Sequence, residues 1–141
     1  MPRTTIKLGT ELAIELEAAI RAEGYGVLEK SRWVAEALTD FIAQRGAKLW
    51  DVGTGDHIEG YEGRLTLTLP EAASDALEQA VAAIRRISPL EEGIRSAVVR
   101  TAIRARVRAV KAAVGSTFEK HRRLAQRSPT RLKRSQQELD V

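Results

Sequence analysis

Cysteine is missing from the chain, and histidine occurs only twice. Without thiols, neither a disulfide framework nor a thiolate metal site can form. His57 and His121 have no metal-ligand spacing around them, so we expect no metal site. No Ser/His/Asp set, apolar carboxylate pair or nucleotide motif can be assembled, and Gly53-Thr54-Gly55 lacks the strand and helix that flank a phosphate loop. We therefore expect no enzymatic activity and no cofactor.

Long apolar runs are also missing. No stretch approaches the length of about eighteen apolar residues that a membrane span needs, and the start of the chain, Met1 to Thr5, has no apolar segment of an export signal. We expect a cytoplasmic protein with no membrane span.

Charge is divided unevenly along the chain. Residues 1–63 carry seven Lys/Arg and eleven Asp/Glu, a net charge of −4, whereas residues 64–141 carry sixteen and eight, a net charge of +8. The total is +4, with a sequence pI of about 9.8. A basic half of this kind is typical of a protein that binds a polyanion, either nucleic acid or an acidic surface.

Two short stretches alternate between polar and apolar residues. Arg3-Thr4-Thr5-Ile6-Lys7-Leu8 is followed, 61 positions later, by Arg64-Leu65-Thr66-Leu67-Thr68-Leu69. A period of two predicts half-buried β-strands. The residues expected to face the core are Thr4, Ile6, Leu8, Leu65, Leu67 and Leu69. Those expected to face outward are Arg3, Thr5, Lys7, Arg64, Thr66 and Thr68.

Two helical patterns follow each stretch. The first pair is predicted from Thr10 to the glycines at 24–26 and from about Lys30 to Gln44, with Trp33 and Phe41 as core residues rather than base-stacking platforms. In the second half, Pro70-Glu71 opens a helix. The segment Ser88-Pro89-Leu90-Glu91 resembles a capping box that would start the next helix early, with Gly115 near its end.

These patterns predict four segments. A first strand-helix-helix unit occupies residues 1–45, a glycine-rich linker residues 46–63, a second unit residues 64–115 and a basic, partly disordered tail residues 116–141. When extended, the linker reaches roughly 60 Å. It can therefore bring the second strand antiparallel to the first.

A strand followed by two helices, made twice, resembles the ribbon-helix-helix family of DNA-binding proteins. The segment Lys30-Ser31-Arg32-Trp33-Val34-Ala35-Glu36-Ala37-Leu38 is similar to the family's second-helix pattern, and its counterpart 65 positions later runs from Arg95 to Ile103. The resemblance covers residues 3–44 and 64 to about 107. It implies a mainly α fold with a two-stranded antiparallel β-ribbon, in which two β-α-α units form one pseudo-twofold domain.

The same resemblance implies sequence-specific binding of double-stranded DNA, with the ribbon in the major groove. Two units in one chain resemble the TraY-type accessory proteins of conjugative plasmids, which act at an origin of transfer. A role as a plasmid accessory protein and a role in transcription regulation as a repressor both stay open. The expected partners are DNA and a relaxase or other DNA-processing protein, with the chain as a pseudo-dimer that can assemble further on DNA. The alternative is a helical protein-protein interaction module.

The outward-facing residues are the predicted base contacts, because arginine, lysine and threonine match donor, acceptor and methyl groups in the major groove. The resemblance places phosphate contacts at the start of each second helix, on Lys30, Ser31, Arg32, Arg95 and Ser96. An early helix start at Pro89 would bury the last two within the helix, whereas a break at Gly93 would restore them. Lys7 matches Thr68 in the repeat, so an imperfect palindromic site is expected.

Basic residues of the tail are predicted to add non-specific DNA contacts or to bind a partner protein, unless they are only solvated. They are Lys120, Arg122, Arg123, Arg127, Arg131, Lys133 and Arg134.

Overall fold

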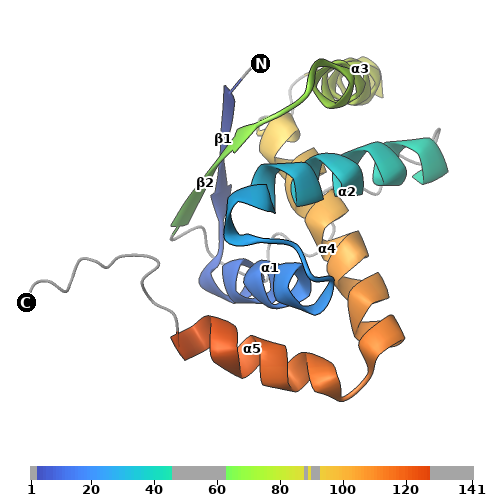
Figure 1. Ribbon diagram of the computed structural model, residues 1–141. Coiled ribbons are helices and arrows are strands. Elements are labelled where there is room, and N and C mark those ends of the chain that lie inside the picture. Colours follow the sequence, from blue (N-terminus) through green and yellow to red (C-terminus); the bar gives the residue numbers. More distant parts are fainter. Residues whose placement is uncertain (1–2, 46–62, 88, 90–92, 128–141) are drawn as a thin grey trace, which may run out of the picture.

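The computed structural model describes residues 3–45, 63–87, 89 and 93–127. Its elements are β1 (Arg3–Leu8), α1 (Thr10–Ala22), a short 3-10 helix η1 (Val27–Glu29), α2 (Lys30–Arg45), β2 (Gly63–Thr68), α3 (Glu71–Ile87), α4 (Ile94–Val114) and α5 (Thr117–Arg127) (Figure 1). The predicted class, a mainly helical fold with a two-stranded antiparallel ribbon, is confirmed. None of the helices in this described part combines the length and the apolar character needed to cross a membrane.

Strands β1 and β2 pair antiparallel along their full length. Thr5 lies opposite Thr66 at the centre, and the register places Arg3 opposite Thr68 and Lys7 opposite Arg64. Burial follows the predicted alternation. The apolar residues Ile6, Leu8, Leu65, Leu67 and Leu69 are buried, and Thr4 is half-buried.

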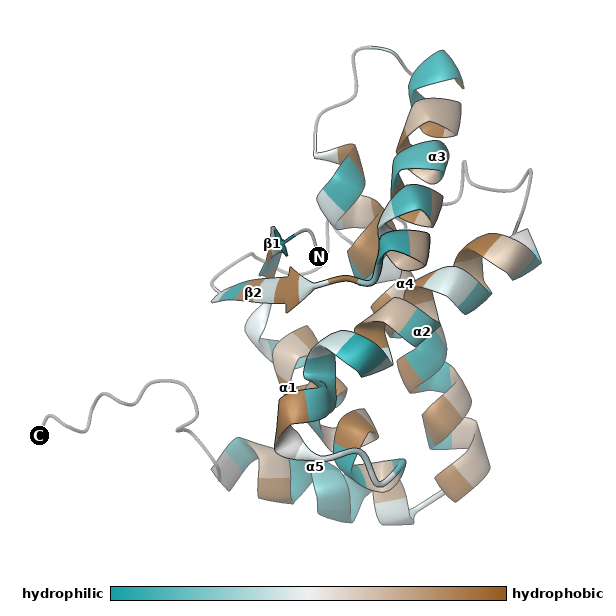
Figure 2. Ribbon diagram, turned by 45° about the horizontal axis from the view of Figure 1, so that its top comes forward, coloured by the Kyte–Doolittle hydropathy of each residue, from teal (hydrophilic) through white to brown (hydrophobic). Residues whose placement is uncertain are grey.

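The helices cover the inner face of the ribbon by crossing between the two halves of the chain. Helix α2 packs against β2 and helix α4 against β1, while α1 packs on α4 and α3 on α2. Helices α2 and α4 also pack on each other. Hydrophobic (brown) and hydrophilic (teal) residues alternate along the helices, as amphipathic packing requires (Figure 2). One hydrophobic cluster runs through both halves, and it includes Trp33 and Phe41 as predicted.

Glycines in the left-handed conformation mark three helix boundaries. Gly24 (φ 78°) follows the end of α1, and Gly115 (φ 63°) ends α4. Gly93 (φ 68°) precedes α4, whose first turn closes through the hydrogen bond from Ala97 N–H to the Gly93 carbonyl at 3.0 Å. Because glycine adopts this conformation without a Cβ clash, it redirects the chain just before the helix.

The predicted early start of α4 is therefore wrong. Pro89 lies in an exposed turn, and the helix begins at Ile94, so the local proline and capping signals give way to the break at Gly93. Ser88, Leu90 and Glu91 lie outside the described residues. The later start places Arg95 and Ser96 in the first turn of α4.

Part of the basic tail forms helix α5, which packs on α1. Phe118 and Ala125, seven positions apart, are buried on one side of the helix. Residues 46–62 and 128–141 lie outside the described part, including the predicted contacts Arg131, Lys133 and Arg134. The predicted linker and the order of the terminal residues therefore stay predictions.

Candidate nucleic-acid interface

The outer face of the ribbon carries six exposed side chains, all of them predicted to lie there. They are Arg3, Thr5, Lys7, Arg64, Thr66 and Thr68. Since the pairing has one register throughout, these side chains form three cross-strand pairs in a row. The face holds three cations and three hydroxyls, and none of its six residues is acidic.

The two ends of this row differ in charge. Lys7 and Arg64 place two cations at one end, whereas the other end pairs Arg3 with Thr68. At the centre, the hydroxyl oxygens of Thr5 and Thr66 lie 3.1 Å apart and share a hydrogen bond. A two-stranded ribbon fits the major groove, where arginine and lysine can donate to guanine and threonine can contact thymine.

The start of α2 lies beside the Arg3·Thr68 end. Ser31 Oγ accepts a hydrogen bond from the backbone N–H of Thr68 at 3.0 Å. Lys30, the preceding residue, forms an ion pair with Glu17 of α1. Of the predicted phosphate contacts in this helix, Ser31 therefore already contacts the ribbon, and Lys30 has a carboxylate partner.

Arg32, the third predicted phosphate contact in α2, joins a polar cluster instead. Its guanidinium contacts Glu29 at 2.6 Å and Glu36 at 3.3 Å, and it stacks over the ring of Tyr25 at 4.7 Å. The hydrogen bond with Glu36 is the main reason why the pKa of Arg32 is raised. The pKa of Glu36 is lowered, chiefly by the hydrogen bond from Tyr25 and with further contributions from Arg32 and Arg106.

The start of α4 carries a matching ion pair. Arg95 Nε and Nη2 donate to the two carboxylate oxygens of Glu78 at 2.9 and 2.6 Å. This hydrogen bonding lowers the pKa of Glu78 and raises that of Arg95. Glu17 and Glu78 are 61 positions apart and Lys30 and Arg95 are 65 apart, which are the offsets of the two sequence repeats. Ser96 is half-buried in the same turn.

Helix α5 directs its cations to different sides. Arg122 forms an ion pair with Glu11 of α1 and lies 3.6 Å from Glu119, whereas Lys120 and Arg123 are exposed. Arg122 thus fastens α5 to the first turn of α1, a contact that the sequence analysis did not anticipate. Arg127 is the last residue of α5.

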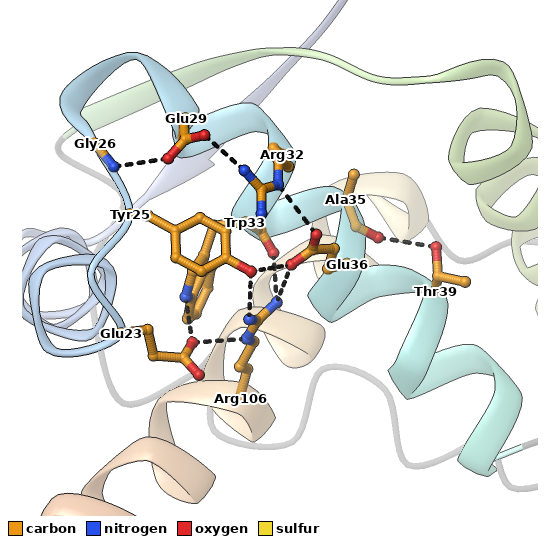
Figure 3. Close-up of polar contacts among 10 residues, drawn as sticks. All are labelled: Glu23, Tyr25, Gly26, Glu29, Arg32, Trp33, Ala35, Glu36, Thr39 and Arg106. Carbon is orange, nitrogen blue, oxygen red and sulfur yellow. Dashed lines mark hydrogen bonds and ion pairs between the residues drawn. The ribbon is translucent and has the colours of Figure 1, made fainter.

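Arg106 of α4 is the centre of a polar cluster that the sequence analysis missed (Figure 3). Its guanidinium donates to the Trp33 carbonyl and Glu23 at 3.0 Å and to the Tyr25 hydroxyl at 3.2 Å, and it lies 4.6 Å from the centre of the Trp33 ring. Trp33 Nε1 also donates to Glu23 at 2.6 Å. The sequence contained a signal for an inward position, because Arg106 lies 65 positions after Phe41, which is a predicted core residue.

Arg100 is the second arginine that the sequence analysis missed. Its side chain is buried, with 6% of the residue exposed, and Nη1 donates to the Lys7 carbonyl at 2.9 Å. Its position among Val98, Val99 and Ala102 was the available signal, because apolar residues this close together in a helix indicate its buried side.

Comparison of the chain with protein-family models, curated proteins and solved structures finds no match in any of the three. The ribbon-helix-helix resemblance consequently depends on the residues and contacts described above.

Proposed function

We propose that the chain binds double-stranded DNA sequence-specifically, with the outer face of the ribbon in the major groove. The observation that carries this proposal is the row of six exposed cations and hydroxyls in three cross-strand pairs. A solvated edge hairpin would not need three cations, three hydroxyls and no acidic residue among the six side chains of one face. The basic second half of the chain adds the long-range attraction that a polyanion requires.

We further propose that two β-α-α units form one pseudo-twofold domain, with the axis near the pair of Thr5 and Thr66. The crossed packing supports it, since α2 packs on the β2 strand of the other half and α4 on β1. The repeated ion pairs, Lys30 with Glu17 and Arg95 with Glu78, support it independently of the strand sequences. The DNA site would then have two related halves, made unequal by the two ends of the ribbon.

Two biological roles use this interface in the same way. One is an accessory protein at an origin of transfer or another site on a mobile element, and the other is a transcriptional repressor. A footprint of the bound site distinguishes the roles, because a repressor's site overlaps a promoter and an accessory protein's site lies beside a nick or recombination site.

A salt titration tests the proposal at its base. We expect duplex DNA of random sequence to bind at low salt, with log affinity falling linearly against log salt by about 0.9 for each phosphate contacted. The measurement is fluorescence anisotropy with a labelled duplex, repeated with genomic DNA as competitor. The dissociation constant of non-specific duplex binding normally lies well below about 1 mM. A dissociation constant above about 1 mM at low salt would therefore contradict DNA binding and favour a protein-interaction module.

A further inference from the structure

Each end of the ribbon is held through its backbone by a helix from the other half of the chain. At one end, the N–H of Thr68 in β2 donates to Ser31 Oγ at the start of α2. At the other, the carbonyl of Lys7 in β1 accepts from Arg100 Nη1 of α4. Lys7 and Thr68 are 61 positions apart, so the two contacts fall on matching residues of the two strands.

The two contacts differ in chemistry although they match in position. Ser31 supplies a short hydroxyl at a partly exposed helix start, whereas Arg100 supplies a guanidinium that is buried beneath the ribbon. Burying a cation is unfavourable unless its donors are satisfied. The hydrogen bond to Lys7 is therefore coupled to the position of Arg100, and a displaced strand end would lose it.

Both contacts lie directly behind side chains that point outward. A backbone hydrogen bond at Lys7 or Thr68 fixes the height and direction of that residue's Cα–Cβ bond relative to the helices. Base contacts depend on sub-ångström placement of such groups, and misplacement weakens them strongly. Ser31 has a further lone pair and its own O–H, so holding Thr68 leaves the hydroxyl able to donate to a phosphate.

We propose that Ser31 and Arg100 are positioning residues that set the two ends of the ribbon separately, so that each one controls recognition of one half of the DNA site. Arg100 acts on the half contacted by Lys7 and Arg64. Ser31 acts on the half contacted by Arg3 and Thr68. This inference rests on the proposed DNA binding. It adds that the two halves of the site are controlled by two different residues, which the outward-facing residues alone do not imply.

The test is selection of binding sites from a random-sequence duplex library, first with the wild-type chain and then with Arg100→Met and Ser31→Ala. The variants Lys7→Ala and Thr68→Ala identify which half of the selected site each end of the ribbon contacts. We expect Arg100→Met to relax base preference in the Lys7 half alone and Ser31→Ala in the Thr68 half alone. The selected duplex should lose about tenfold in affinity with Arg100→Met, the value of one good base contact, and the random duplex less than about twofold.

Conservative variants separate positioning from general damage. Ser31→Thr keeps the hydroxyl acceptor and should restore the preference that Ser31→Ala loses, while urea denaturation confirms that each variant is folded. If Arg100→Met does not fold, the contrast between Ser31→Ala and Ser31→Thr still decides the question. Relaxation of both halves together, or equal loss on selected and random duplexes, would overturn this inference. Failure of the wild-type chain to enrich any site would refute the proposed function itself, and this inference with it.

Discussion

The two halves of the chain, residues 3–45 and 63–114, share their order of strand and two helices but differ in what surrounds them. Both present alternating strand residues outward, and both pair a cation at the start of the second helix with a carboxylate of the first. Helix α5, however, packs mainly on α1 and to a smaller extent on α4, and within the described part of the chain α3 has no comparable contact with it. The shared features lie on the ribbon and at the starts of α2 and α4, and the difference lies on the side of α1 that α5 covers.

The sequence of α1 explains where α5 packs. Ile14 is half-buried and Ala18 buried, whereas their respective counterparts 61 positions later in α3, Asp75 and Gln79, are both polar and not buried. Helix α1 therefore has a second apolar side that α3 does not have. The ion pair between Arg122 and Glu11 adds a polar contact along the same interface.

The largest effect is expected at a second difference between the halves, Arg106 and its counterpart Phe41. Replacing Arg106 with Met removes the cation shared by Glu23 and Glu36 and leaves the Trp33 carbonyl without that donor. We expect a loss of about 1–3 kcal/mol in the free energy of unfolding, since the half-buried guanidinium donates several hydrogen bonds that no other group would replace. Urea denaturation measures it.

A matched control is available two residues along the same helix. Arg108 is exposed, so Arg108→Met should change the free energy of unfolding by less than about 0.5 kcal/mol. Arg106 of the second half contacts Glu23, Tyr25 and Trp33 of the first half. If both variants had the same free energy of unfolding, these contacts would not contribute to holding the two halves together.

A smaller effect is expected where the halves agree, at the paired carboxylates Glu17 and Glu78. In free protein they neutralise Lys30 and Arg95, the predicted phosphate contacts, and a phosphate must compete with them. The double variant Glu17→Gln with Glu78→Gln should bind random duplex DNA about three- to tenfold more tightly, because each exposed ion pair contributes 1 kcal/mol or less. The salt slope should steepen by about one per carboxylate.

Asp75→Asn in α3 controls for the change in net charge, since Asp75 is an exposed carboxylate on the same helix as Glu78. It should change affinity much less than Glu78→Gln alone. Affinity that is unchanged or weaker in the double variant would contradict competition between carboxylate and phosphate at these helix starts.

Local patterns in the sequence were sufficient to predict the ribbon and most helix boundaries. The alternation in residues 3–8 and 64–69 depends only on neighbouring residues, so the inward and outward sides follow directly. The start of α4 was missed because two local signals conflict, and the left-handed Gly93 overrides the proline and capping pattern at residues 88–91.

Long-range contacts were not predictable in the same way. Lys30 and Ser31 were correctly placed at a helix start, whereas the position of Arg95 depended on whether the chain breaks at Gly93. The partners of all three, Glu17, Thr68 and Glu78, come from other elements. The positions of Arg100 and Arg106 indicated an inward side of α4, but the groups that they contact follow only from the packing of α4 against β1 and α2. Which cation is exposed and which is buried depends on that packing.

The central claim is that the outer face of the ribbon recognises the DNA sequence, and the most direct test measures the specificity of the double variant Arg64→Ala with Thr66→Ala. Both residues are exposed, Arg64 at one end of the ribbon and Thr66 in its middle. Competition between the wild-type-selected duplex and a random duplex measures specificity, and Arg86→Ala, at an exposed site in the last turn of α3, serves as control. The account predicts that the double variant stays folded but loses at least about tenfold of its preference for the selected duplex, while the control keeps it. An unchanged preference in the double variant would contradict the placement of the ribbon in the major groove.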